Sequence, residues 1–281
     1  MTFDMPVGQP IFVKGNLTLS DDLFGFFYTE IISPQSLNIP ILPYRTNDGG
    51  VYCPTGSWFG WYFTEELKQA CKLYGYKVNL LYGYKFERES IFTKFVNNFY
   101  NIRLKTEKNS PENVIAKLIL NSVFGRTGMS PIVDWTSILN EDEFTQLLSQ
   151  HDITEFHEIG DSGKFIVRQS RVELTDSHNN SNVAIASAIT AYSRMHINKY
   201  KFLPNNNVFY SDTDSVFLQH PLNENEVSNT LGAMKLENGN ISRAVFLGPK
   251  CYALELQNGE HIIKIKGLTK SSLPSFNDML S

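Results

Sequence analysis

Residues 207–218 read NVFYSDTDSVFL, a stretch in which Asp212 and Asp214 interrupt two short apolar segments. The aromatic and β-branched residues on both sides predict a β-hairpin with the polar residues at its bend. Ser, Asp and Thr favour turns, so one interpretation of the pair is a solvated bend. The other is a binding site, because residues two apart in extended chain share a face, and paired carboxylates suit Mg²⁺.

The composition is that of a globular protein: 281 residues, of which 42% are hydrophobic and 19% are charged. No apolar run is long enough to span a membrane, and three scattered cysteines indicate neither a disulfide framework nor a zinc site. The net charge of −4 argues against a uniformly basic surface. The charges segregate, however, because residues 103–126 are mainly basic and residues 138–163 mainly acidic. A local surface for nucleic acid is therefore compatible with the sequence.

The helix with the clearest signals is predicted to begin at Pro111. Ser110 suits the N-cap, Pro111 suits the first helical position, and the run NVIAKLILNSVF contains no breaker before Gly125. Apolar residues near helical spacing predict another helix over 90–103. The two helices would form a hairpin, joined by a short polar loop.

Lys117, Asn121 and Phe124 follow one another along one face of the helix that begins at Pro111. A cation, an amide and an aromatic ring in one stripe suit a nucleoside triphosphate. An ordinary amphipathic helix with a solvated lysine is the alternative interpretation. Arg103 and Lys105 lie at the loop end of the hairpin, where a solvated loop accounts for them.

Further elements are predicted on both sides of this hairpin. A helix is expected from Thr64, its N-cap, to Lys72, and another over 183–200. The strand predictions are VNLLYGYKF, KFIVRQSRVEL, KCYALEL and HIIKIKGL, the last two paired about an NGE turn.

The pair of strands near the C-terminus carries basic residues that alternate with apolar ones. Lys250 and Tyr252 share one face of the first strand, and Lys264 and Lys266 share one face of the second. This pattern suits a sheet that lies along a phosphodiester backbone. Ordinary exposed lysines are the alternative.

Together these segments resemble the B-type DNA polymerases. YSDTDS is similar to their carboxylate-bearing motif, and KLILNSVFG to their fingers motif, Lys-x-x-x-Asn-Ser-x-Tyr-Gly, with Phe124 in place of the tyrosine. Lys250-Cys251-Tyr252 is similar to the Lys-x-Tyr motif at the primer terminus, and the three motifs follow the family's order. The protein-primed branch, found in small phages and on linear mitochondrial plasmids, resembles the chain most. MPVGQP, SWFGWYFTEELKQA and GYKVNLLYGYKFE also look like segments of that branch.

The resemblance implies an α+β fold. Its core would be a polymerase palm, an antiparallel sheet with helices, and a helical hairpin inserted into the palm would form the fingers. Residues 1–89 would be the N-terminal part of the palm and residues 90–128 the fingers. Residues 129–182 would be an insertion without an assigned role, and residues 183–281 the remaining palm up to the thumb boundary. The exonuclease domain and most of the thumb would be absent from this chain.

The resemblance also implies which residues would bind the metal ions and the primer strand. Asp212 and Asp214 would be catalytic carboxylates of a two-metal Mg²⁺ site, with Asp214 the stronger candidate for a direct ligand. Lys250 and Tyr252 would hold the primer strand of template–primer DNA near its 3′ end. Lys266 would continue that contact.

The remaining candidates would bind the incoming deoxynucleotide. Lys117 would contact its triphosphate, assisted by Lys105 and Arg103. Asn121 and Phe124 would border the nascent base pair. The reaction implied is the addition of deoxynucleotides to a primer 3′-hydroxyl during DNA replication.

The family has a further catalytic Asp, in an Asp-x-x-Ser-Leu-Tyr-Pro motif upstream of the segment similar to MPVGQP, and this chain does not contain it. We therefore expect Asp212 and Asp214 to form half of the metal site, active once the upstream part is supplied. An inactive remnant that retains DNA or nucleotide binding is one alternative. An Asp-x-Asp nucleotide-sugar transferase is another, and it leaves the fingers-like helix unexplained. The branch further implies a terminal protein as primer and a mitochondrial location, encoded in the organelle without a transit peptide.

Overall fold

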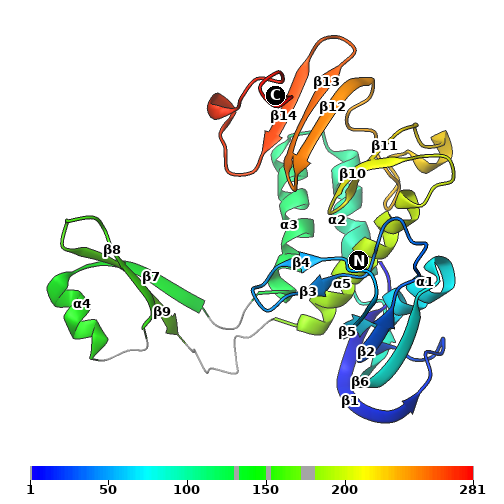
Figure 1. Ribbon diagram of the computed structural model, residues 1–281, viewed down its shortest axis with the longest axis horizontal. Helices are drawn as coiled ribbons and strands as arrows, with labels where there is room; N and C mark the ends of the chain where they lie inside the picture. Colours follow the sequence, from blue (N-terminus) through cyan, green and yellow to red (C-terminus); the bar gives the residue numbers. More distant parts are fainter. Residues whose placement is uncertain (1, 130–132, 150–152, 172–180, 281) are drawn as a thin grey trace. The chain divides into compact units, whose positions relative to one another are not determined.

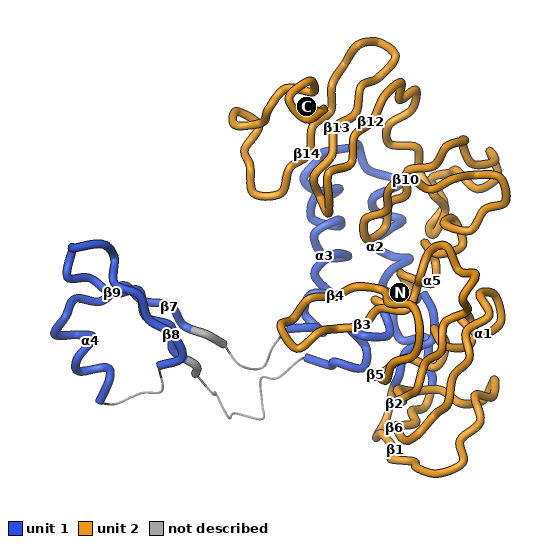
Figure 2. The backbone as a smooth tube through the Cα atoms, viewed as in Figure 1, with its two compact units in different colours: residues 1–6, 88–189 blue, residues 7–87, 190–281 orange. Residues whose placement is uncertain are grey.

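The protein mixes α-helices with antiparallel sheets, as Figure 1 shows for a computed structural model of the chain. The structure describes residues 2–129, 133–149, 153–171 and 181–280. The predicted α+β class is confirmed. None of the helices in these ranges is long and apolar enough to cross a membrane. The chain divides into two compact units, residues 1–6 with 88–189, and residues 7–87 with 190–281 (Figure 2).

The largest sheet has four strands in the order β1-β6-β2-β5. The strands are β1 (Met5–Leu17), β2 (Gly25–Ile32), β5 (Ser57–Phe63) and β6 (Lys77–Glu89). The central strand β2 pairs antiparallel with both β5 and β6. Helix α1 (Thr64–Tyr74) follows β5 directly, and the short strands β3 (Tyr44–Arg45) and β4 (Val51–Tyr52) form a separate pair.

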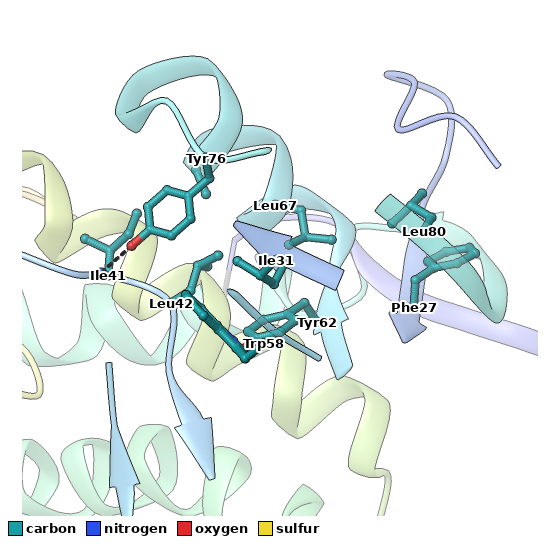
Figure 3. Close-up of a cluster of buried hydrophobic side chains, with 10 residues drawn as sticks. Phe27, Ile31, Ile41, Leu42, Trp58, Tyr62, Leu67, Tyr76 and Leu80 are labelled. Atoms are coloured by element: carbon teal, nitrogen blue, oxygen red, sulfur yellow. Dashed lines mark hydrogen bonds between the residues drawn. The ribbon is translucent and has the colours of Figure 1, made fainter. Parts of the chain in front are cut away.

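One face of this sheet packs into a hydrophobic core with residues of α1 and the loop before β3 (Figure 3). Phe27 and Ile31 of β2 are completely buried there, as is Leu67 of α1. The polar groups inside the core have partners. Trp58 donates its indole N–H to the hydroxyl of Tyr62 at 2.7 Å. This arrangement fixes β2 and α1 in the second unit.

Thr64 does not act as the N-cap of α1, so that prediction was wrong. Phe63 is the N-cap, without a side-chain capping hydrogen bond, and Thr64 is the first helical residue and fully buried. Its hydroxyl oxygen instead accepts the backbone N–H of Gly25 at 3.1 Å. Thr64 therefore ties the helix to the start of β2, and the partner lies 39 residues away in the sequence.

An ion pair between a buried carboxylate and a partly exposed guanidinium joins α1 to helix α5 (Val183–Lys201), which the apolar pattern predicted. The guanidinium of Arg194 donates to the two carboxylate oxygens of Glu66 at 2.6 and 2.7 Å, and Glu66 is only 2% exposed. Burial raises the pKa of the Glu66 carboxyl, and the hydrogen bonds from Arg194 oppose this shift. Gln69 adds a side-chain hydrogen bond to the carbonyl of Met195 at 3.2 Å.

The first unit contains the predicted helical hairpin, formed by α2 (Thr93–Lys105) and α3 (Pro111–Thr127) (Figure 1). Ser110 caps α3 as predicted, because its side chain accepts the backbone N–H of Asn113 at 3.3 Å. The Asn113 amide in turn donates to the carbonyl of Arg103 at 2.9 Å, which attaches the end of α2 to the start of α3. The helix α3 continues through Gly125, where the sequence indicated a possible stop.

The acidic segment folds as a small sheet with one helix. Its strands are β7 (Val133–Asn140), β8 (Ile153–Glu158) and β9 (Lys164–Arg171) in the order β7-β9-β8, with α4 (Glu141–Leu148). The strand predicted in KFIVRQSRVEL is β9, and the end of that prediction lies outside the described residues. Phe144 of α4 is buried against Phe165, with ring centroids 4.4 Å apart. The sequence did not predict β7, β8 or α4.

The C-terminal part of the second unit consists of a hairpin and a three-stranded sheet. The predicted hairpin is formed by β10 (Val208–Asp212) and β11 (Ser215–Leu218). The sheet contains β12 (Ile241–Gly248), β13 (Cys251–Leu256) and β14 (His261–Ile265), each paired antiparallel with the next. The pairing of β13 with β14 was predicted, whereas β12 was not.

Candidate functional site

The two aspartates lie at the bend of the β10–β11 hairpin. Asp212 pairs with Ser215, which leaves Thr213 and Asp214 as a two-residue turn. Thr213 has a φ of 53°, in the left-handed region, and its hydroxyl donates to the Asp212 carboxylate at 2.9 Å. The Ser215 hydroxyl donates to the carbonyl of Asp212 at 3.0 Å. Asp212 is thus half-buried at the end of a strand, whereas Asp214 is exposed at the tip.

Lys250 contacts the hairpin from the turn between β12 and β13, so the prediction that it lies within the strand of Tyr252 was wrong. Its ammonium group lies 2.9 and 2.7 Å from the two carboxylate oxygens of Asp212. Its backbone N–H donates to the hydroxyl of Tyr210 at 2.7 Å, and its φ of 59° is again left-handed. The hydrogen bonds from Lys250 lower the pKa of Asp212. The same contact, with a smaller contribution from the charge of Asp214, raises the pKa of Lys250.

An aromatic cluster packs behind this contact. The ring of Tyr210 stacks on Phe246 of β12, with centroids 5.1 Å apart and planes at 12°. Tyr252 of β13 lies 5.4 Å from Phe217 and 5.6 Å from Tyr210, and burial raises the pKa of its phenol. Lys250 and Tyr252 therefore both lie against the hairpin that carries the aspartates.

Lys266 lies beside Lys250, one residue after the end of β14, and not within that strand as the sequence predicted. The backbone N–H of Lys266 donates to the carbonyl of Lys250 at 3.0 Å, and its side chain is exposed. The structure therefore brings together the three residues that the sequence proposed for a primer strand, Lys250, Tyr252 and Lys266.

The other five candidates belong to the first unit. Lys117, Asn121 and Phe124 are all exposed on α3, and the Phe124 side chain is 38% accessible. Arg103 and Lys105 lie in the last turn of α2. The Nε of Arg103 is buried and has no hydrogen-bond partner within the described ranges.

Sequence reasoning missed the residues that position these side chains. Tyr210 and Phe246 orient Lys250 and Tyr252, and Asn113 holds the backbone of Arg103. Tyr210 belongs to the quoted YSDTDS segment, but its contact with Lys250 spans 40 residues and leaves no local pattern. The contact of Asn113 could have been predicted, because a polar side chain in the first turn of a helix can reach the loop before it.

The donors at the hairpin suit a hard cation. Within the described part of the chain, no group of three or more His, Cys, Asp or Glu side chains comes together as a metal site. Asp212 and Asp214 offer two carboxylates, and Mg²⁺ is commonly held by one or two carboxylates when substrate phosphates and water supply its other ligands. The oxygens of Asp212 are engaged by Lys250, so Asp214 is the more accessible donor.

Replacing Lys250 by methionine is expected to raise the pKa of Asp212 towards the ordinary value of about 3.9, because the main cause of its depression is removed. Carbon-detected NMR titration of Asp-labelled protein measures this pKa. Lys266→Met is the matched control, since the hydrogen bond of Lys266 to Lys250 is made by its backbone and survives the substitution. An Asp212 pKa that stays low in Lys250→Met would contradict the contact.

Comparison with known proteins provides a family for the chain. The sequence profile of one family, described as DNA polymerase type B, organellar and viral, matches residues 1–205. Curated relatives include a probable DNA polymerase of Neurospora intermedia, 33% identical over 97% of this chain, and one of Ascobolus immersus, 34% identical over 95%. The chain spans 29% and 22% of the lengths of these two relatives.

A solved structure has the same fold. Phi29 DNA polymerase, complexed with primer-template DNA and incoming nucleotide substrates, superposes with a TM-score of 0.70. The match covers 99% of this chain and 50% of that one, at 18% identity. At this identity the likeness shows the fold. The palm-like mixture of antiparallel sheets and helices predicted from the sequence is therefore confirmed.

Proposed function

Because the chain belongs to the type B DNA polymerases of organelles and viruses, we propose that it forms part of the centre for template-directed DNA synthesis. The observation that carries the proposal is the contact of Lys250 with Asp212 at the turn of the hairpin. It joins a candidate primer ligand to a candidate metal ligand, although 38 residues separate them. In the proposed reaction the primer 3′-hydroxyl attacks the α-phosphate of a deoxynucleotide. A phosphodiester bond forms, pyrophosphate leaves, and the hydroxyl proton is released.

In this proposal residues 1–89 and 183–281 are palm, residues 90–128 are fingers, and residues 129–182 are an insertion. The α2–α3 hairpin and the separate small sheet of β7, β8 and β9 support these divisions. The organellar scope of the family supports replication in mitochondria. The resemblance to the protein-primed branch supports a terminal protein as the primer.

Asp212 and Asp214 are the proposed metal ligands of this chain. When bound, Mg²⁺ stabilises the negative charge that develops on the attacking and leaving oxygens. The exposed turn presents Asp214 directly, and the end of strand β10 fixes the backbone of Asp212. Asp214 is therefore proposed as the principal donor.

Lys250, Tyr252 and Lys266 are proposed to hold the primer strand. The Lys250 ammonium is a compact point charge that binds either a carboxylate or a phosphate. Its side chain is 53% exposed, so an incoming phosphate can reach it without opening the fold. Lys250 would then exchange Asp212 for the primer. Tyr210 and Phe246 would keep the lysine and the Tyr252 ring in position.

The exposed stripe on α3 is proposed to bind the incoming nucleotide. Lys117 would contact the triphosphate, with Arg103 and Lys105 assisting from the end of α2. Asn121 and Phe124 would border the nascent base pair. The unpaired Nε of Arg103 supports this assignment, because a buried donor without a partner is stabilised when an acceptor arrives.

Replacing Lys117 by methionine is expected to raise the KM for deoxynucleotides by about 10- to 100-fold, since a hydrogen bond to a charged group contributes about 1.5–3 kcal/mol. Steady-state single-nucleotide incorporation by a polymerase that contains this chain measures the effect. Lys108→Met, in the exposed loop between the two helices, is the control and should leave the KM unchanged. Equal effects of the two variants would refute the assignment.

Primer extension tests the proposed function as a whole. The chain alone, and the polymerase that contains it, are supplied with template–primer DNA, Mg²⁺ and deoxynucleotides. Extension by the polymerase supports the proposal. Template–primer binding without extension by that polymerase would support the inactive remnant instead. Absence of both activities would overturn the assignment to DNA synthesis.

A further inference from the structure

The face of the large sheet that lies opposite the core carries aromatic side chains on all four strands. Along β2, Phe27, Thr29 and Ile31 are buried in the core, so Tyr28 points to the other face. Its antiparallel partners Trp61 and Tyr82 lie on that same face. We call this set the aromatic face: Phe12 of β1, Tyr28 of β2, Phe59 and Trp61 of β5, Tyr82 and Tyr84 of β6.

These rings form a continuous surface across the sheet. Tyr28 lies 5.3 Å from Tyr82 and 5.8 Å from Trp61, measured between ring centroids. Trp61 stacks with Tyr84 at 6.1 Å, and Phe12 reaches Tyr84 at 5.5 Å. These centroid separations lie within the range of aromatic ring contacts in protein cores, so neighbouring rings of the surface touch one another.

Four of the six rings are largely accessible. The exposed fractions are 56% for Phe12, 49% for Trp61, 47% for Phe59 and 42% for Tyr84. Monomeric proteins rarely expose contiguous apolar surfaces, so a surface of this kind indicates a binding site. The hydrophobic core lies on the opposite face of the sheet, and on the aromatic side, among the described residues, only the end with Phe26 and Phe63 is covered, by Tyr192 of α5.

Cations flank the aromatic face on two sides. Lys77 pairs with Ile32 across β6 and β2 and therefore shares its face, and Lys14 lies two residues after Phe12 on β1. Neither lysine forms an ion pair with a residue that the structure describes. Glu30 also lies on this face, where its carboxylate accepts the amide of Asn79 at 3.3 Å.

We propose that the aromatic face binds an unpaired nucleic-acid strand. Its bases would stack on the exposed rings, and Lys14 and Lys77 would neutralise phosphates. Aromatic side chains on an open antiparallel sheet bind single strands in this way, because every base has a flat π-face. A duplex keeps its bases stacked internally and offers mainly phosphates, so it gains little from these rings. The surface thus goes beyond the proposed synthesis centre and needs neither metal nor nucleotide.

The test titrates the full chain with fluorescein-labelled dodecathymidine without Mg²⁺ or deoxynucleotides, and follows fluorescence anisotropy. Trp61→Ala and Tyr84→Ala are each expected to weaken binding by about 5- to 100-fold, the range for loss of one base–ring stack. Trp135→Ala is the control, because Trp135 is 58% exposed but lies in the separate small sheet. It should bind like the unchanged chain.

Tryptophan fluorescence provides a second readout that does not depend on affinity alone. In a Trp135→Phe background the remaining indoles are Trp61 and the buried Trp58. Dodecathymidine should quench the exposed Trp61, and Trp61→Phe should remove the quenching while the phenyl ring preserves binding within about threefold. Thermal unfolding of each variant verifies that it is folded.

Three results would overturn the proposal. The first is a binding curve of Trp61→Ala that equals that of the unchanged chain. The second is that Trp61→Ala weakens the binding of single-stranded and of duplex dodecamers equally, and the third is a concentration-dependent self-association of the chain that Trp61→Ala abolishes. The last result would assign the aromatic face to a second protein chain. Since the assay contains neither metal nor deoxynucleotide, failure here leaves the proposed synthesis centre standing, and failure of primer extension leaves this surface standing.

Discussion

Replacing Asp214 by asparagine is expected to reduce primer extension by a polymerase containing this chain by about 10³-fold or more. Stabilisation by a bound metal is worth several kcal/mol in the transition state, and each 1.36 kcal/mol is tenfold in rate. Asp214 is the exposed carboxylate of the hairpin turn, whereas Lys250 engages Asp212. Incorporation of one nucleotide at saturating substrate measures the loss.

The dependence of the extension rate on the Mg²⁺ concentration distinguishes a metal ligand from a residue with only a structural role. In Asp214→Asn, raising the Mg²⁺ concentration should recover part of the rate, because the defect is weak metal binding. Glu260→Gln provides the control, since Glu260 is an exposed acid in the turn between β13 and β14. Wild-type rates in Asp214→Asn would favour the other interpretation of the pair, a solvated bend.

Replacing Arg194 by methionine is expected to lower the free energy of unfolding by about 3 kcal/mol or more. The substitution leaves the Glu66 carboxylate buried without its cation, and an unpaired buried charge is costly. Adding Glu66→Met removes that charge and should restore much of the loss. Chemical denaturation of both variants, followed by circular dichroism, measures these energies.

The loss in Arg194→Met should also depend on pH. Without the guanidinium, burial alone acts on Glu66, so its pKa in the folded variant lies above the unfolded value of about 4.3. The free energy of unfolding of the variant is therefore highest at low pH. It falls as the pH rises from about 4.3 through the raised pKa, because the buried carboxyl must then ionise. The deficit should therefore be smaller at pH 5 than at pH 8.

A matched surface variant identifies the buried charge as the cause. Arg243 pairs with Glu255 at 3.3 Å and is 57% exposed, so Arg243→Met should cost at most about 1 kcal/mol. A comparable loss in both variants, or a pH-independent loss in Arg194→Met, would contradict the role given to the pair.

The parts of the fold that the sequence predicts are those with local causes. Ser110 caps α3 through the amide only three residues ahead, and Thr213 and Asp214 form the bend between adjacent strands. Thr64 carries the same apparent signal as Ser110, yet its partner is Gly25, brought near by the sheet. A cap and a long-range hydrogen bond look alike in sequence, and only tertiary structure distinguishes them.

Strands β7 and β8 and helix α4, which lie next to the predicted strand β9, were missed for a different reason. Its segment contains few apolar residues, so neither helix nor strand periodicity is strong. The spacing of Asn140 and Glu143 fits a capping box, and this local signal for the start of α4 was overlooked. In the candidate site, too, only the features with a local sequence signal were predicted. The motifs identify Asp212 and Lys250 individually, but the ion pair between them depends on how two separate turns meet.

Lys250 serves as an internal counter-ion for Asp212, and this has a consequence for thermodynamic linkage. When an anion binds the ammonium group of Lys250, the Asp212 carboxylate is no longer neutralised by it. The affinity of Asp212 for cations therefore rises. By reciprocity, a cation at Asp212 increases the affinity of Lys250 for anions by the same factor. One contact of 2.7 Å thus makes the two kinds of ligand cooperative without any movement of a domain.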